Sequence, residues 1–257
     1  MRAWQAEKRV RKIINEADIL LEVLDARFPD LTRIPVYEKY VKKLGKPLIL
    51  VLNKCDLVPK EYAEDWKALL SKEYPTVFVS TRMRWGSRKL RNAIKEQAPS
   101  FPVKVGVFGY PNVGKSSLIN LLKGRGVSSV SPRAGYTRGE QIVRISRKIY
   151  LIDTPGIIYP RSEEILLLIG GLEPERAEDP ELAAEILIRN LHAMGEMEES
   201  TLEEYAKRRK FFLKGGEPDT WRAAVDILRR WQRGEIKIKT YDWLKELSES
   251  QESHLGE

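Results

Sequence analysis

Short apolar runs alternate with amphipathic stretches through the first two thirds of the chain. The apolar runs are rich in Val, Ile and Leu and end at turn residues, which is typical of buried strands. We predict strands at 17–27, 46–56, 75–80, 103–108, 141–146 and 148–153. Helical spacing predicts helices at 3–16, 36–44, 61–71 and 86–97, and another after residue 116. This alternation indicates an α/β fold with a mostly parallel sheet, helices on both faces and an antiparallel edge from the last two strands.

Beyond Pro160 the strand pattern fades and helical periodicity replaces it, which predicts helices at 181–194, 201–213 and 220–234. Charge is uneven in this part of the chain. Residues 163–204 carry thirteen acids against two bases, whereas residues 205–239 carry eleven bases against four acids. We therefore expect an α/β domain over 1–162, a small, basic all-α domain over 163–246 and a polar tail over 247–257.

The composition narrows the class of protein. A formal net charge of +8 at pH 7 favours a polyanionic partner such as nucleic acid. The single cysteine, Cys55, allows no internal disulfide and fits a reducing compartment. The sequence has neither an apolar run long enough to span a membrane nor a signal-peptide pattern. We expect a cytoplasmic monomer without a membrane or disulfide partner.

Residues 109–117 read GYPNVGKSS and fit the phosphate-loop pattern G-x-x-x-x-G-K-[ST]. The motif lies between a predicted strand and a predicted helix, so its backbone N–H groups converge on one point and favour an anion. Lys115 is expected to reach the β- and γ-phosphates, and the Ser116 hydroxyl to ligate Mg²⁺. The remaining predicted nucleotide-binding residues of this segment are Asn112, Val113, Gly114 and Ser117.

The sequence Asn53-Lys54-Cys55-Asp56 follows an apolar strand and has the N-K-x-D pattern that reads guanine. The Asp56 carboxylate can accept hydrogen bonds from guanine N1–H and from the 2-amino group. Adenine lacks both donors, and such a mismatch discriminates by about 10⁴-fold. Asn53 is expected to contact the base edge, and the aliphatic stem of Lys54 to cover the ring. Cys55 is expected to be an unreactive member of the loop.

Two more segments end strands at the same sheet edge, where open α/β sheets bind their ligands. Ser80 and Thr81 are expected to offer donors to the guanine carbonyl. Asp153 opens the sequence DTPG and is expected to hold Mg²⁺ through water, and the Gly156 N–H is expected to meet the γ-phosphate. Thr137 is the candidate switch threonine of the metal shell, although an ordinary loop threonine is an equally good interpretation.

The order of these motifs departs from that of ordinary GTPases, in which the phosphate loop precedes the base-reading loops. Here residues 53–56 and 80–81 come before the phosphate loop. This order resembles the circularly permuted GTPases, and most closely the YlqF/RbgA family of ribosome-assembly factors, in an archaeal- or thermophile-like form. Asp25-Ala26-Arg27 is similar to that family's DAR signature, and residues 215–236 are similar to its C-terminal helical domain. The resemblance implies GTP hydrolysis coupled to maturation of the large ribosomal subunit, with the C-terminal domain touching rRNA.

Hydrolysis is expected to be slow without a stimulating partner. Ile157 follows DTPG at the place where Ras-like enzymes have a water-orienting Gln, and an aliphatic side chain cannot position water. Lys115, Thr137 and Gly156 are expected to stabilise the transition state. The resemblance implies that Asn112 binds K⁺ in place of an arginine finger, with a simple turn residue as the alternative. The family's N-terminal histidine has no counterpart, because the two histidines are His192 and His254.

Basic residues in the helical domain are the candidates for RNA contact. These candidates are Lys207, Arg208, Arg209, Lys210, Arg222, Arg229, Arg230 and Arg233. Aromatic residues lie among them and could stack on bases, but their helical spacing fits a core better: Phe211, Phe212, Trp221 and Trp231. Two other functions stay open, an RNA-binding assembly placeholder with GTP as a structural ligand, and an ATP-using phosphotransferase.

Overall fold

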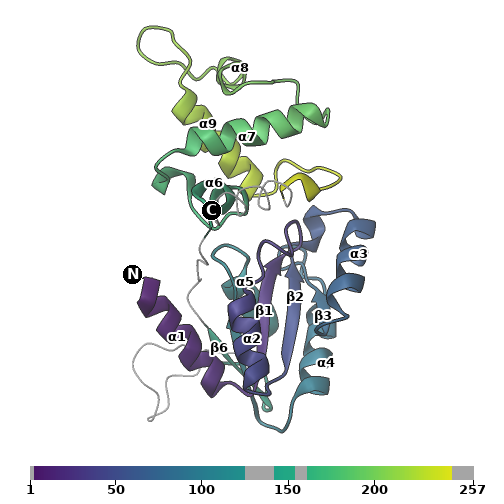
Figure 1. Ribbon diagram of the computed structural model, residues 1–257. Coiled ribbons are helices and arrows are strands. Elements are labelled where there is room, and N and C mark those ends of the chain that lie inside the picture. The colour runs from purple at the N-terminus through teal and green to yellow at the C-terminus, as the bar shows by residue number, and fades with distance from the viewer. Residues whose placement is uncertain (1–2, 125–141, 154–160, 245–257) are drawn as a thin grey trace, which may run out of the picture. The chain divides into compact units, whose positions relative to one another are not determined.

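The computed structural model describes residues 3–124, 142–153 and 161–244 of the 257-residue chain (Figure 1). The chain divides into two compact units, unit 1 over Met1–Tyr159 and unit 2 over Pro160–Glu257. Each unit is described by itself. The predicted tail over 247–257 lies outside the described residues. Among the described residues, no helix is both long and apolar enough to cross a membrane.

A six-stranded sheet forms the centre of unit 1, in the order β3-β2-β1-β4-β6-β5 (Figure 1). The strands are β1 (Ile19–Asp25), β2 (Leu48–Asn53), β3 (Thr76–Phe78), β4 (Val103–Phe108), β5 (Ile142–Arg144) and β6 (Ile149–Asp153). Neighbouring strands pair in parallel except β5, which runs antiparallel to β6. The predicted fold class and the antiparallel edge are confirmed.

The central strands are apolar along their whole length because they are covered on both faces. All seven residues of β1 and all six of β2 are buried. The helices of unit 1 are α1 (Ala3–Glu16), α2 (Pro35–Lys43), the short 3₁₀ helix η1 (Cys55–Leu57), α3 (Lys60–Leu70), α4 (Ser87–Gln97) and α5 (Lys115–Lys123). The β1–β2 and β4–β6 connections run in opposite directions across the sheet, so right-handed crossovers place α2 and α5 on opposite faces.

Unit 2 is helical in its described part. Its elements are α6 (Glu163–Leu168), the 3₁₀ helix η2 (Pro174–Arg176), α7 (Pro180–Ala193), α8 (Leu202–Arg208) and α9 (Thr220–Gln232). Trp231 is fully buried, and its indole Nε1 donates to the carbonyl oxygen of Leu168 over 2.8 Å. The adjacent Gln232 donates to the carbonyl of Leu167 over 2.7 Å. These bonds join the end of α9 to α6, a helix that the sequence pattern did not predict.

The predicted helix over 201–213 is too long. Helix α8 ends at Arg208, because Lys210 adopts a left-handed backbone with φ of 58°. The chain then turns through Gly215 and Gly216, and Phe212 pairs with Pro218 in an antiparallel bridge. The aromatic residues divide accordingly. Trp231 belongs to the core, whereas Phe212 and Trp221 are 47% and 51% exposed.

Candidate nucleotide-binding site

The phosphate loop joins β4 to α5 and includes two glycines whose positions admit no side chain. Gly109 has φ of +148°, and a Cβ there would lie 2.4 Å from the carbonyl oxygen of Val23. Gly114 has φ of +99°, and a Cβ there would lie 2.2 Å from Asn53 Nδ2. The backbone therefore passes closer to its neighbours than any other residue allows. This cradle and the N-terminus of α5 fit a phosphate group.

Lys115 is the first residue of α5 and is buried, with 7% of its surface exposed. Its Nζ donates to the carbonyl oxygen of Tyr110 over 2.6 Å, so the ammonium group lies over the loop that it closes. Ser116, Ser117 and Asn112 are exposed on the same segment. Asn112 adopts a left-handed backbone with φ of 58°, a conformation that asparagine tolerates better than most residues.

Asn53 connects three parts of the site. It ends β2 and is fully buried; its Nδ2 donates to the carbonyl of Val113 over 2.7 Å, and its Oδ1 accepts from Thr81 N–H over 3.2 Å. These two bonds fix the orientation of the amide. We expected Asn53 to contact the base edge, but the structure shows it holding the phosphate loop against the segment that begins at Ser80. Discrimination of the base then depends mainly on Asp56.

Ser80 orients Asp56. The Ser80 hydroxyl is buried; it donates to Asp56 Oδ1 over 2.6 Å and accepts from Met83 N–H over 2.9 Å. A hydroxyl has one proton to donate. The Ser80 proton, which we expected to reach the guanine carbonyl, is therefore committed to Asp56. The backbone N–H of Cys55 also bonds the Val79 carbonyl over 3.3 Å, which ties the two base-reading segments together.

Asp25 gives the DAR triplet a structural role that the sequence did not reveal. Its fully buried carboxylate accepts from Arg27 Nε over 3.0 Å, from Arg27 Nη2 over 2.8 Å and from Lys54 Nζ over 2.7 Å. Burial alone raises the pKa of Asp25, but the charges of Arg27 and Lys54 outweigh it and hold that pKa well below the usual value. Asp25 is thus a permanent anion that holds the ammonium end of Lys54.

Lys54 is held in a left-handed backbone with φ of 64°, between the end of β2 and η1. Burial lowers the pKa of its ammonium group, and the charge of Asp25 opposes that shift. Cys55 next to it is half-buried. Burial, followed by the charge of Asp56, raises the pKa of its thiol to about 11, so Cys55 is a neutral thiol at pH 7.

The remaining candidates are placed only in part. Asp153 ends β6, where it pairs with Val107 of β4, so its backbone lies at the carboxyl edge beside the phosphate loop. Thr137 and Gly156 lie outside the described residues. By hydrogen bonds, the structure brings together Asn53, Asp56, Ser80, Thr81 and Val113, from three separate stretches of the chain.

In unit 2, several basic candidates for RNA contact form ion pairs with acids of the same unit. Arg208 lies 2.9 Å from a Glu199 oxygen and 3.2 Å from one of Glu198, and Arg209 lies 3.3 Å from one of Asp226. Others pair in the same way: Lys207 with Glu203, Arg229 with Glu175, and Arg230 and Arg233 with Glu235. Arg222 instead stacks over the Phe211 ring, 4.5 Å from its centroid. Their positive charge is partly neutralised.

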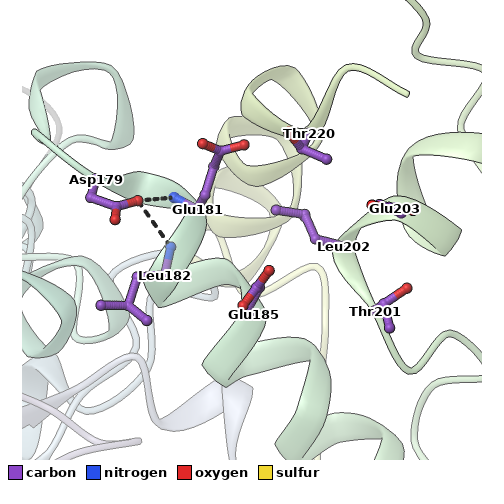
Figure 2. Close-up of a pocket in the computed structure, with 8 residues that line it drawn as sticks. All are labelled: Asp179, Glu181, Leu182, Glu185, Thr201, Leu202, Glu203 and Thr220. Atoms are coloured by element: carbon purple, nitrogen blue, oxygen red, sulfur yellow. Dashed lines mark hydrogen bonds between the residues drawn. The ribbon is translucent and has the colours of Figure 1, made fainter. Parts of the chain in front are cut away.

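Figure 2 shows a pocket of unit 2 between α7, α8 and the start of α9. Asp179 caps α7 there by accepting from the N–H groups of Glu181 and Leu182, and Glu185 and Glu203 also line the pocket. Four of its eight lining residues are acids and none is a base. A polyanion would be repelled from this pocket, so RNA contact in unit 2 has to be sought elsewhere.

The mostly parallel sheet, the glycine cradle at the start of α5 and the oriented Asp56, which precedes that cradle in the chain, together define a circularly permuted GTP-binding fold. Comparisons with known proteins agree. Residues 104–210 match the family described as 50S ribosome-binding GTPase. An uncharacterized GTP-binding protein of Methanocaldococcus jannaschii is 39% identical over 266 residues, which cover 97% of this chain and 70% of that protein.

Nucleolar GTP-binding protein 2 of Schizosaccharomyces pombe is 37% identical over 246 residues, covering 88% of this chain and 46% of that protein. The chain thus spans less than half the length of this eukaryotic relative. Among solved structures, YlqF from T. maritima bound to GNP has a TM-score of 0.71 and 25% identity, covering 92% of this chain and 97% of that one. Its GDP-bound form has a TM-score of 0.69 and 26% identity, covering 90% of this chain and 97% of that one. The chain belongs to the YlqF/RbgA family of circularly permuted GTPases.

Proposed function

We propose that this protein is a GTP-hydrolysing switch that binds rRNA in the large ribosomal subunit or its precursor and assists assembly of the subunit. The description of its family as 50S ribosome-binding and the nucleolar GTP-binding relative support the ribosomal partner. We place this activity in a cytoplasmic monomer, as the single cysteine and the membrane analysis led us to expect.

Recognition of guanine rests on the hydrogen bond from Ser80 to Asp56, which is the observation that carries the proposal. It fixes the Asp56 carboxylate within a loop that is tied to the phosphate loop through Asn53. A carboxylate held in this way accepts the two guanine donors without reorganising. An adenine would leave it unpaired in a partly buried site, which costs about 1–3 kcal/mol for each missing hydrogen bond, or more for a charged group.

The phosphate end of the site supplies the chemistry of hydrolysis. Lys115 would bind the β- and γ-phosphates, and Gly156 N–H would meet the γ-phosphate. Ser116, Thr137 and Asp153 would hold Mg²⁺, which neutralises charge that develops on the phosphate oxygens. Asn112 would hold K⁺ and so take the part of an arginine finger. The exposed position of Ser116 and Asn112 on the phosphate-loop segment supports both assignments.

Slow intrinsic turnover follows from the aliphatic Ile157, which offers no hydrogen bond to the attacking water. The same residue favours the second candidate function, a placeholder that binds GTP as a structural ligand. GTP turnover should be measured with and without large-subunit particles, in K⁺ and then in Na⁺. We expect stimulation by particles in K⁺ and its loss in Na⁺. Turnover that stays at the intrinsic rate in all four conditions would leave the placeholder function.

Asn112→Ser tests the potassium assignment. The variant should lose the difference between K⁺ and Na⁺ but keep its affinity for GDP. Asn120→Ser on the exposed part of α5 is the matched control and should keep the cation dependence. An Asn112→Ser variant that is still stimulated by K⁺ would show that the cation binds elsewhere or that Asn112 is only a turn residue.

Asp56→Asn tests the base assignment. The substitution replaces one acceptor oxygen by an N–H₂ donor, so it should exclude guanine and admit xanthine, which has a carbonyl oxygen at the matching position. We expect the preference to move from GTP to XTP. A variant that instead gained ATP turnover would favour the phosphotransferase alternative.

A further inference from the structure

The segment from Arg82 to Lys89, named here the basic loop, connects β3 to α4 (Figure 1). It carries Arg82, Arg84, Arg88 and Lys89, and residues 74–95 contain six bases and no acid. Met83 and Trp85 alternate with the arginines and are 48% and 54% exposed. An exposed tryptophan between arginines is uncommon on a surface without a partner, because its large apolar area stays in water.

The basic loop differs from the basic residues of unit 2 in its charge balance. Arg82, Arg84, Arg88 and Lys89 are all exposed, and within the described residues they form no ion pair. By contrast, Arg208 and Arg209 each contact an acid of their own unit. The full positive charge of the basic loop is therefore available to an anionic partner.

The basic loop also has a fixed shape. Ser80 and Trp85 exchange two backbone hydrogen bonds of 3.0 and 3.3 Å. Gly86 closes the turn with φ of +80°, where a Cβ would lie 2.1 Å from the carbonyl oxygen of Phe78. A rigid presentation loses little conformational entropy on binding. The loop is thus built to hold Trp85 and its arginines outward.

Its anchor is the base-reading machinery itself. Ser80, which pairs with Trp85, donates to Asp56, and Thr81 N–H bonds Asn53. A molecule bound to the basic loop would lie one to five residues along the chain from these contacts. The surface is therefore placed to sense, or to influence, the guanine pocket.

We propose that the basic loop binds single-stranded RNA, with Trp85 stacking on a base and Arg82 and Arg84 contacting phosphates. Aromatic stacking joined to arginine–phosphate contact is the way proteins bind single strands without reading sequence. Charge complementarity favours RNA, since the segment has six bases and no acid. This inference rests on the proposed function for the presence of an RNA partner, and it places a contact on the nucleotide-binding unit.

The test measures binding of a fluorescent, mixed-sequence RNA oligonucleotide to the full chain by anisotropy, at several salt concentrations. Trp85→Ala should weaken affinity by roughly tenfold or more. Arg82→Gln with Arg84→Gln should lower the slope of log affinity against log salt by about 1.4, which is two single-strand phosphate contacts. GDP affinity without RNA should stay near wild type in both variants, which shows that unit 1 is folded.

Lys39→Gln with Lys43→Gln is the matched control, because it removes two exposed charges from α2. Its salt slope should equal that of the wild type. Equal losses in the control and the loop variants, or no loss in either, would overturn the inference while leaving the proposed function intact. Absence of any wild-type RNA affinity would overturn both. Loop variants that bind RNA normally but no longer bind large-subunit particles would show that the loop contacts a protein instead.

Discussion

Glu22 lies in the middle of β1 and is fully buried in an apolar strand. Its Oε1 accepts from Ile34 N–H over 2.7 Å, while Oε2 has no partner among the described atoms. Burial, and next the charge of Glu38, raises the pKa of Glu22 well above its usual value. The folded protein therefore holds a proton there that the unfolded chain releases at lower pH.

This raised pKa predicts the sign of a pH effect. Stability linked to Glu22 is greatest below the unfolded pKa near 4.5 and is lost as pH rises through the folded pKa. Glu22→Gln keeps the acceptor for Ile34 and cannot ionise, so it should stabilise the protein at pH 8 by roughly 1–3 kcal/mol. The gain should shrink toward pH 4.5. Thermal melts across this range test it, with the exposed Glu61→Gln as a control that should show no such trend. A gain that is the same at every pH would contradict the assignment.

Asp25 supports a second prediction, that it acts on the nucleotide through Lys54. Asp25→Asn removes the anion that holds Lys54 Nζ, so the lysine stem should no longer be fixed beside the base. We expect GDP affinity to fall roughly tenfold, in line with the loss of about 1.4 kcal/mol. The variant should also be less stable, because Arg27 is left buried and unpaired.

A double-mutant cycle separates these two effects. Lys54→Met should weaken GDP binding on its own, and adding Asp25→Asn to it should cause little further loss of affinity. All affinities are measured far below the melting temperatures, so that instability alone does not move them. Losses that simply add would mean that Asp25 only supports the fold.

At the scale of single elements, α5 offers a matched pair of glycines at its two ends. Both adopt positive φ, but a Cβ at Gly114 would lie 2.2 Å from Asn53 Nδ2, whereas a Cβ at Gly124 would have nothing within 4 Å. Gly114→Ala should displace the buried Asn53 and break its bond to Val113, which lowers GDP affinity by about tenfold or more. Gly124→Ala should cost about 1 kcal/mol of stability from backbone strain and leave the affinity unchanged. Titration with a fluorescent GDP analogue and thermal melts measure the two effects. Equal affinity in both variants would show that the contact with Asn53 is unimportant.

The strands were predictable because residues buried on both faces leave continuous apolar runs, as in β1 and β2. The end of α8 was not, because the sequence continues in helix-compatible residues and only the left-handed Lys210 stops the helix. Helix α6 was missed because it spans only Glu163–Leu168, too short to show a period. Local patterns therefore describe long elements well and short ones poorly.

The site shows the same limit. Phosphate-loop and guanine motifs could be read from local sequence, and the strand order brings them to one edge. The partners of their side chains could not, because Asn53 and Val113 are 60 residues apart. Only the folded arrangement shows that Asn53 joins loops, that Ser80 turns its proton toward Asp56 and that Asp25 holds Lys54. The basic loop was overlooked because its bases interrupt no motif.

At the scale of the whole molecule, the anchoring of the basic loop on Ser80 predicts that RNA and guanine nucleotide bind cooperatively. RNA that restricts the loop should also restrict Ser80 and Asp56, so the guanine reader is pre-ordered and GDP binds more tightly. Linkage requires that GDP tighten RNA binding by the same factor, which we expect to be at least about fivefold. Ser80→Ala removes the hydroxyl bond to Asp56 and should bring this factor close to one, even if it also weakens GDP binding. Ser71→Ala, an exposed serine at the end of α3, should leave it unchanged. Both affinities are measured by titration with and without a saturating amount of the other ligand. Coupling that survives in Ser80→Ala would mean that RNA reaches the nucleotide by another route, and no coupling in the wild type would mean that the loop binds RNA without informing the switch.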